Sequence, residues 1–159
     1  MNESKLDVKK RAVIEIAENL FLSQGLATTE MKEIARCASI SRSTLYRMFD
    51  SRETLAFAVA DKCLHELFDP KPMEIYGTDR SGFEILRSYS SNLIETMIQG
   101  VRYVKYLSEF DQMFSGDYPD TPEARKYVQF NRQRHDRQIL LNILRLGTED
   151  GSIRGDIDA

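Results

Sequence analysis

The first strong pattern of apolar positions lies near the amino terminus, in VKKRAVIEIAENLFLSQG. The apolar side chains recur at the spacing of one helical face, and they are Val13, Ile16, Ala17, Leu20 and Phe21. Gly25 follows where a glycine commonly ends a helix. The pattern predicts a helix over residues 5–24. Four cations stand near its start, Lys5, Lys9, Lys10 and Arg11, where the helix dipole does not favour them. Either contact with phosphate or simple solvation would explain why these four cations stand there.

Two short apolar patterns come next, separated by a break at Ala38-Ser39-Ile40. Thr28 or Thr29 is expected to cap the first short helix, whose apolar face holds Met31, Ile34, Ala35 and Ala38. Ser41 is expected to cap the second helix, in which Leu45, Met48 and Phe49 point inward. SRET then opens a longer helix with Leu55, Val59, Cys63 and Leu67 on one side.

Two short helices joined by a tight turn and flanked by longer helices form the layout of a helix-turn-helix unit. In such a unit the second short helix enters the major groove of DNA. Its outward residues would be Arg42, Ser43, Thr44, Tyr46 and Arg47. These residue types reach phosphates and base edges, so the pattern indicates a DNA-binding surface.

The segment from Arg11 to Val59 resembles the amino-terminal domain of the TetR family of transcriptional repressors. The matching features are AENLF followed by QG, the Thr28-Thr29 pair, the Ile34-Ala35 pair, STLYRMF and SRETL. Their combination in this order is specific, although each piece alone is common. Ser39 stands where the family usually has glycine, and a left-handed conformation there costs about 1 kcal/mol. Ser43 and Arg52 also replace commoner residues, a glycine or alanine and a lysine.

The resemblance implies contacts to operator DNA at matching positions, which are Thr29, Arg42, Ser43, Thr44, Tyr46, Arg47 and Arg52. Arg42 and Arg47 are the candidates for reading bases. Tyr46, Thr29 and Arg52 are expected to contact phosphates and set the register.

The carboxy-terminal hundred residues also show helical spacing. Pro70, Pro72 and Gly77 mark a linker over 68–82. Helices are predicted over 82–98, 101–114 and 122–146, followed by turns to the end of the sequence. The protein is therefore expected to be all-α, with a helix-turn-helix DNA-binding domain at 1–52 and a helical regulatory domain at 53–159.

In the TetR family the second domain holds an inducer pocket and a dimer interface. The resemblance suggests a pocket wall of aromatic and soft residues, namely Tyr89, Tyr103, Tyr106, Phe110, Met113 and Tyr127. An ordinary helical core explains the same residues. Glu109 and Asp111, beside them, are expected to be exposed acids, with contact to a cationic ligand as the alternative.

Family members commonly continue past a segment resembling GSIRGDID into two further helices that form the dimer's four-helix bundle, and this sequence stops at Ala159. A sequence truncated at its carboxy end and another mode of dimerisation are the two explanations. A homodimer is expected in either case, because two recognition helices one DNA turn apart normally share the binding.

Charge and cysteine content add little to the picture. The net charge is −3, but residues 1–60 carry +1 and residues 61–159 carry −4, which favours the amino-terminal third as the partner of a polyanion. Cys37 and Cys63 make no disulfide framework. Cys37, near the turn, is expected to be a buried, inert residue, with a redox-active thiol as the alternative. Neither a signal peptide nor a membrane span is recognisable, so a cytoplasmic protein is expected.

Motifs for other chemistry are missing from the sequence. Cys63 and His65 are two positions apart and would lie on different sides of a helix. We therefore expect no metal, no cofactor and no enzymatic activity.

The expected function is a DNA-binding repressor released from operator DNA by a small-molecule inducer. The alternative is a protein-interaction module with the same fold that no longer binds DNA specifically.

Overall fold

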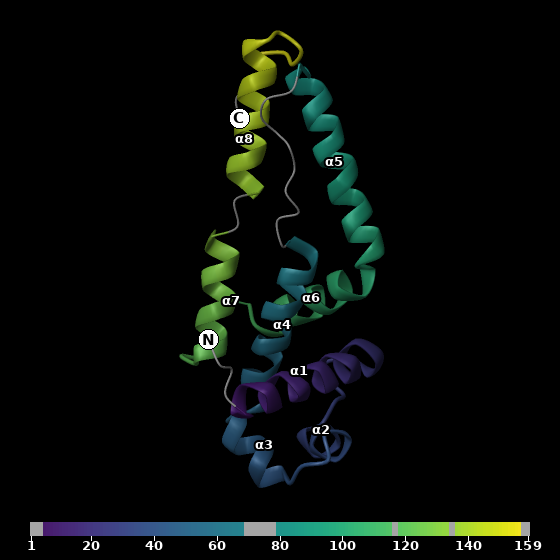
Figure 1. Ribbon diagram of the computed structural model, residues 1–159, viewed down its shortest axis with the longest axis vertical. Helices are drawn as coiled ribbons and strands as arrows, with labels where there is room; N and C mark the ends of the chain where they lie inside the picture. Colours follow the sequence, from purple (N-terminus) through teal and green to yellow (C-terminus); the bar gives the residue numbers. More distant parts are fainter. Residues whose placement is uncertain (1–4, 69–78, 116–117, 134–135, 157–159) are drawn as a thin grey trace. The chain divides into compact units, whose positions relative to one another are not determined.

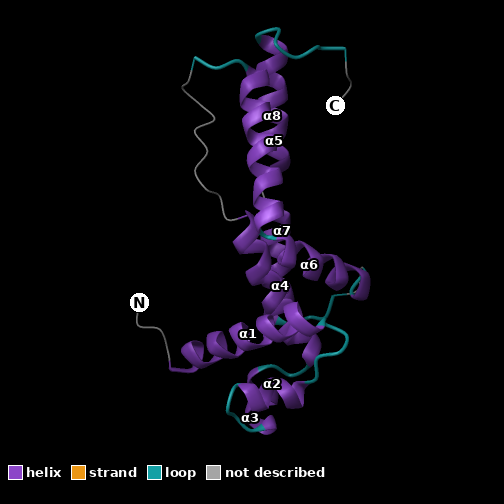
Figure 2. Cartoon of the chain, turned by 90° about the vertical axis from the view of Figure 1, so that its right-hand side faces the viewer, coloured by secondary structure: helices purple, strands orange, loops and turns teal. Residues whose placement is uncertain are grey.

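The computed structural model describes residues 5–68, 79–115, 118–133 and 136–156. Every regular element in these ranges is a helix (Figures 1 and 2), which confirms the all-α prediction. The helices are α1 (Lys5–Gln24), α2 (Met31–Cys37), α3 (Arg42–Met48), α4 (Arg52–Phe68), α5 (Gly82–Gln99), α6 (Val101–Met113), α7 (Pro122–Gln133) and α8 (Asp136–Glu149). Among the described residues, none of these helices is both long and apolar enough to cross a bilayer.

One compact unit combines two separate segments of the chain, Met1–Glu66 and Val101–Arg132. It holds α1 to α4 together with α6 and α7, and α2 and α3 lie side by side in both Figure 1 and Figure 2. An aromatic cluster on α4, α6, α7 and the segment before α7 forms much of its core. Phe57 lies at the centre, with ring centroids 4.8 to 5.7 Å from those of Phe110, Phe114, Tyr118 and Tyr127.

The second compact unit, Leu67–Gly100 and Gln133–Ala159, is built on the pairing of α5 with α8. Ile85 and Ile143 are buried at the contact, and Leu86, Tyr89 and Ile139 pack against them. A Cβ at Gly82 would lie 2.2 Å from the Gly147 backbone nitrogen, so glycine is needed where the two helices meet. Ser81 and Glu84 cap the start of α5 with a reciprocal pair of bonds.

The predicted bounds of the helices at 5–24, 82–98 and 101–114 agree with α1, α5 and α6 within a residue. The single helix predicted over 122–146 is wrong, because the structure has α7 and α8 there, and they belong to different compact units. The apolar periodicity continues across both helices, so it gave no sign of the break. Residues 134–135 lie outside the described residues, as do residues 69–78 of the predicted linker.

Candidate nucleic-acid interface

The helix α3 is short, and its conformation depends on its cap and its buried face. The Ser41 hydroxyl accepts a hydrogen bond of 3.1 Å from the Thr44 amide, as the sequence predicts for the amino-terminal cap. Leu45, Met48 and Phe49 are buried, also as predicted. These contacts fix which face of α3 turns outward.

The outward face of α3 carries polar and cationic side chains. Arg42, Ser43, Tyr46 and Arg47 are exposed, and the Tyr46 side chain is 47% accessible although it is aromatic. Thr44 is half-buried, and its hydroxyl lies 2.8 Å from that of Ser41. The face therefore offers two guanidinium groups, a phenol and a hydroxyl to a partner without moving any core residue.

The turn between α2 and α3 is held by a non-glycine residue in the left-handed region. Ser39 has a φ of 53°, which confirms the conformation expected from the position of glycine in the family. The Ser39 amide donates to the Arg36 carbonyl, and the Ile40 amide donates to the Ala35 carbonyl at 3.0 Å. These bonds close the end of α2 and set the direction in which α3 begins.

The start of α2 differs from the prediction. Glu30, rather than Thr28 or Thr29, occupies the cap position, and its side chain makes no cap bond. The two threonine hydroxyls instead donate backwards to the end of α1, Thr29 to the Gly25 carbonyl at 2.8 Å and Thr28 to the Gln24 carbonyl. Thr29 is 0% exposed. The phosphate contact predicted for its side chain does not fit this placement, and Thr28 is the exposed neighbour.

Arg52, at the start of α4, is partly exposed and is already engaged. Its Nη1 atom donates to the Ala27 carbonyl at 3.1 Å, and its Nε atom lies 3.9 Å from a carboxylate oxygen of Glu53. The guanidinium thus links α4 to the loop between α1 and α2. A guanidinium has five donors, so it retains others for a phosphate.

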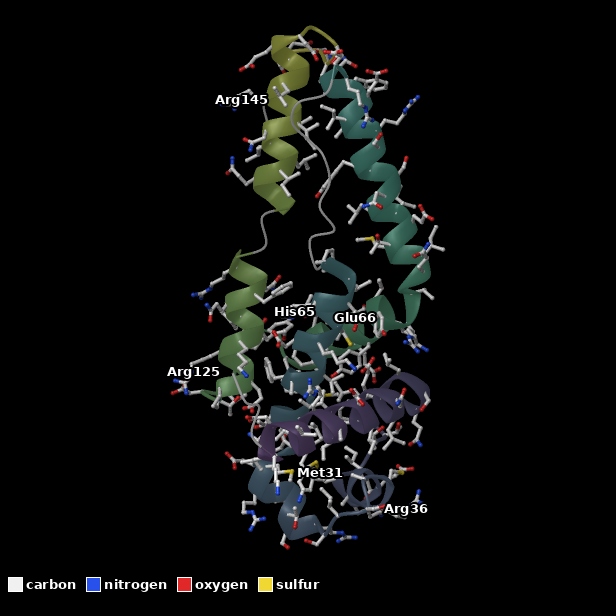
Figure 3. The ribbon with its side chains drawn as sticks, in the orientation of Figure 1. Met31, Arg36, His65, Glu66, Arg125 and Arg145 are labelled. Atoms are coloured by element: carbon white, nitrogen blue, oxygen red, sulfur yellow. The ribbon has the colours of Figure 1, made fainter. Side chains whose placement is uncertain are left out.

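An open hollow lies beside α3, lined by Thr28, Glu30, Lys32, Glu33, Arg36 and Arg42. Figure 3 shows Arg36 on the outer side of α2 and Met31 on its inner side. The Lys32 ammonium lies 2.8 Å from Glu30, and its hydrogen bond and charge lower the pKa of that carboxyl. Sequence reasoning missed Lys32 and Arg36, although their place on the polar face of a short helix was a signal.

The cations at the start of α1 divide into two sets. Lys5, Lys9 and Arg11 are exposed. Lys10 lies over the ring of Phe49, 5.3 Å from its centroid, and its ammonium is 3.8 Å from a carboxylate oxygen of Glu123. Lys10 therefore has a structural use within the unit.

The residues predicted to line a ligand pocket do not share one environment. Tyr106, Phe110 and Tyr127 are buried within the aromatic cluster around Phe57. The remaining three differ in exposure and place: Met113 is exposed, Tyr103 is half-buried beside Arg102, and Tyr89 belongs to the second unit. The first three are brought together, and their role toward a ligand stays a prediction.

The two acids beside the aromatic residues both have partners in the first unit. Glu109 is partly buried and accepts hydrogen bonds from the Leu26 and Ala27 amides. Asp111 is exposed and accepts a bond of 3.2 Å from the Tyr127 hydroxyl. The expected exposure is thus wrong for Glu109, because a loop distant in the sequence covers it.

The two cysteines also lie in different settings. Cys37 is exposed at the end of α2, which corrects the expectation that it is buried. It lies outside the apolar face that Met31, Ile34 and Ala35 form on this helix. Cys63 is buried in α4, and burial raises its pKa to about 12. Among the described residues, three or more His, Cys, Asp or Glu side chains nowhere gather as metal ligands would.

An exposed polar face on a capped second helix, a tight turn and a buried inner face define a helix-turn-helix protein of the DNA-binding class. Residues 13–59 match the family model described as bacterial regulatory proteins, tetR family. The match runs from α1 into α4, across the four helices of the amino-terminal part, so this part of the chain is similar to the DNA-binding domain of the TetR family.

Similar proteins extend the match beyond those residues. The chain is 29% identical over 154 residues to the HTH-type transcriptional repressor KstR2 of Rhodococcus jostii (strain RHA1), covering 94% of this chain and 70% of the relative. It is 28% identical over 157 residues to KstR2 of Mycolicibacterium smegmatis (strain ATCC 700084 / mc(2)155), with the same coverage. The crystal structure of the TetR family regulator PfmR from Thermus thermophilus has the same fold. Its TM-score is 0.66 at 24% identity, and the match covers 92% of this chain and 75% of that chain.

Proposed function

We propose that this protein is a transcriptional repressor that binds double-stranded operator DNA through α3 and is released by a small molecule. One observation carries the proposal: Arg42, Tyr46 and Arg47 are exposed on the same helix whose opposite face is buried by Leu45 and Met48. The relatives that match most of the chain are named transcriptional repressors, and this supports repression rather than activation.

The residues of the interface have separate roles in this proposal. Arg42 and Arg47 read base edges in the major groove, because a guanidinium bonds well to guanine. Ser43, Thr44, Tyr46 and Arg52 contact phosphates or bases nearby and set the register. Thr29 acts from inside, since its hydroxyl is bonded to Gly25, and the exposed Thr28 takes the phosphate contact instead.

The regulatory part of the proposal concerns residues 53–159, with DNA binding assigned to residues 1–52. A ligand held by aromatic residues such as Tyr106, Phe110 and Tyr127 would favour a conformation in which two recognition helices no longer match successive major grooves. The other proposed ligand contacts are Tyr89, Tyr103 and Met113. The inducer is an unidentified small molecule, and the repressor acts as a homodimer in the cytoplasm without enzymatic activity.

Binding to duplexes selected by the wild-type chain from a randomised library tests the proposal. We expect a selected duplex to bind in the presence of a scrambled competitor. Arg47→Ala should weaken that binding by about 1–3 kcal/mol and relax the preference at one base position. Titration at several salt concentrations reports the number of phosphate contacts, because each contact releases counterions.

A matched control is Arg145→Ala. Arg145 is an exposed arginine on α8 (Figure 3) and lies 3.8 Å from Glu149, so its removal changes the net charge equally. We expect this variant to bind as the wild type does. Equal and weak binding of the wild type to selected and scrambled DNA would contradict the proposal and favour the interaction module.

A further inference from the structure

The loop between α1 and α2 has amides that its own backbone does not satisfy. Gly25 ends α1 with a φ of 96°, and its amide donates to the Phe21 carbonyl. The chain then turns through Leu26, which is 1% exposed. A buried amide needs a partner other than water.

The partner comes from a helix more than eighty positions further along the chain. One carboxylate oxygen of Glu109, on α6, accepts hydrogen bonds from the Leu26 amide at 3.1 Å and the Ala27 amide at 3.4 Å. A Cβ at Gly25 would lie 3.4 Å from the same oxygen. The carboxylate is therefore packed directly against the loop.

The neighbours of Glu109 hold α6 firmly against α4. The Tyr106 hydroxyl donates to the Ala56 carbonyl at 2.9 Å and is buried. Phe110 is buried with its ring centroid 4.8 Å from that of Phe57. The Glu109 carboxylate consequently extends from a fixed support, not from a mobile surface.

The carbonyl side of the same loop is held by residues of the proposed interface. Arg52 donates to the Ala27 carbonyl at 3.1 Å, and Thr29 donates to the Gly25 carbonyl. Exposed Thr28, which lines the hollow with Arg42, belongs to this loop as well. Any shift of the loop moves the partner of the Arg52 guanidinium and the start of α2.

We propose that Glu109 is a positioning residue for operator binding. Its carboxylate fixes the loop of residues 25–28 and so holds Arg52 and α2 in the geometry that the DNA requires. The inference rests on the proposed function, because it assumes that Arg52 and α2 take part in operator binding. Glu109 acts on them through the loop and not by a contact with the DNA. The inference gives α6 a direct polar contact with the loop between α1 and α2, in addition to the apolar packing of the aromatic cluster.

The test uses the full chain and two substitutions, Glu109→Ala and Glu109→Gln. Hydrogen exchange of the Leu26 and Ala27 amides reports the loop without any DNA. Affinity for a duplex selected by the wild type, measured well below the unfolding temperature, reports positioning. We expect faster exchange and about tenfold weaker binding for Glu109→Ala. Glu109→Gln keeps an acceptor oxygen and should recover most of both properties, which a general loss of stability would not explain.

Glu149→Ala is the control for net charge, because Glu149 is exposed on α8 and lies 3.8 Å from Arg145. It should leave exchange and affinity unchanged. Unchanged exchange at Leu26 and Ala27 in Glu109→Ala would overturn the inference, as would faster exchange with unaltered affinity. A wild type that selects no sequence would overturn the proposed function and the inference with it, whereas selective wild-type binding that Glu109→Ala leaves intact would overturn the inference alone.

Discussion

At the scale of single residues, the two cysteines differ in burial. Cys37 is open to solvent at the end of α2, whereas Cys63 is 0% exposed inside α4. Burial is the main reason that the pKa of Cys63 rises from 9.0 to about 12, and the charge of Glu18 adds to the shift. The folded protein therefore favours the neutral thiol at this position.

This difference predicts a loss of stability at alkaline pH. Between pH 9.0 and about 12 the unfolded chain releases the Cys63 proton while the folded chain keeps it. The contribution of this group to the free energy of unfolding is complete below pH 9.0 and falls as the pH rises, by at most about 1.4 kcal/mol per pH unit. Denaturant unfolding over this range should show a smaller decrease for Cys63→Ala than for the wild type. Cys37→Ala is the control and should retain the wild-type slope; an equal slope in all three proteins would contradict the assignment.

Single positions also mark the limit of what the sequence could predict. The left-handed turn at Ser39 followed from the resemblance to the TetR family, in which glycine usually stands at this position, and it is confirmed. The burial of Thr29 did not follow, because helical spacing identifies a face but not the neighbour that covers it. The burial expected for Cys37 rested on its residue type, although the residue lies outside the apolar face of α2. The sequence gave no signal of the contact that Glu109 makes, since its partners are amides of a loop more than eighty positions earlier.

At the scale of elements, α5 and α8 depend on close approach of their backbones. We predict that Gly82→Ala lowers the free energy of unfolding by about 1–3 kcal/mol. The added Cβ would lie 2.2 Å from the Gly147 nitrogen and 2.3 Å from its Cα atom, so the helices must move apart. Denaturant unfolding followed by helical circular dichroism measures the change. Ser91→Ala, at an exposed position of the same helix, should be close to neutral, and an unchanged midpoint for Gly82→Ala would refute the close contact.

The positions of the helices were otherwise the best-predicted feature of the chain. The spacing of Val13, Ala17 and Phe21 and the glycine at position 25 placed α1 correctly, because these residues are buried along one face and Gly25 ends the helix. The boundary between α7 and α8 was missed for a physical reason. Both helices carry an apolar stripe, and each stripe packs in a different unit, so periodicity cannot separate them.

At the scale of the whole molecule, the proposed mode of DNA binding requires two copies of the chain. We predict that sedimentation equilibrium gives twice the chain mass of 18.4 kDa, because half-site binding by one recognition helix is weak. Large apolar side chains exposed in the second unit support a partner surface, and they include Ile94, Ile98, Leu140 and Leu141. A dilution series serves as the control. A single-chain mass throughout the series would contradict the homodimer.

The first unit is built from two separate segments, Met1–Glu66 and Val101–Arg132. This arrangement affects how the unit forms during synthesis on the ribosome. When residue 66 leaves the ribosome, Phe57 has none of the aromatic partners that α6, α7 and Tyr118 later provide. The Leu26 amide likewise has no carboxylate acceptor until Glu109 has been synthesised. The helices α1 to α4 are therefore translated early, but α4 obtains its last packing partners only after α7 has emerged.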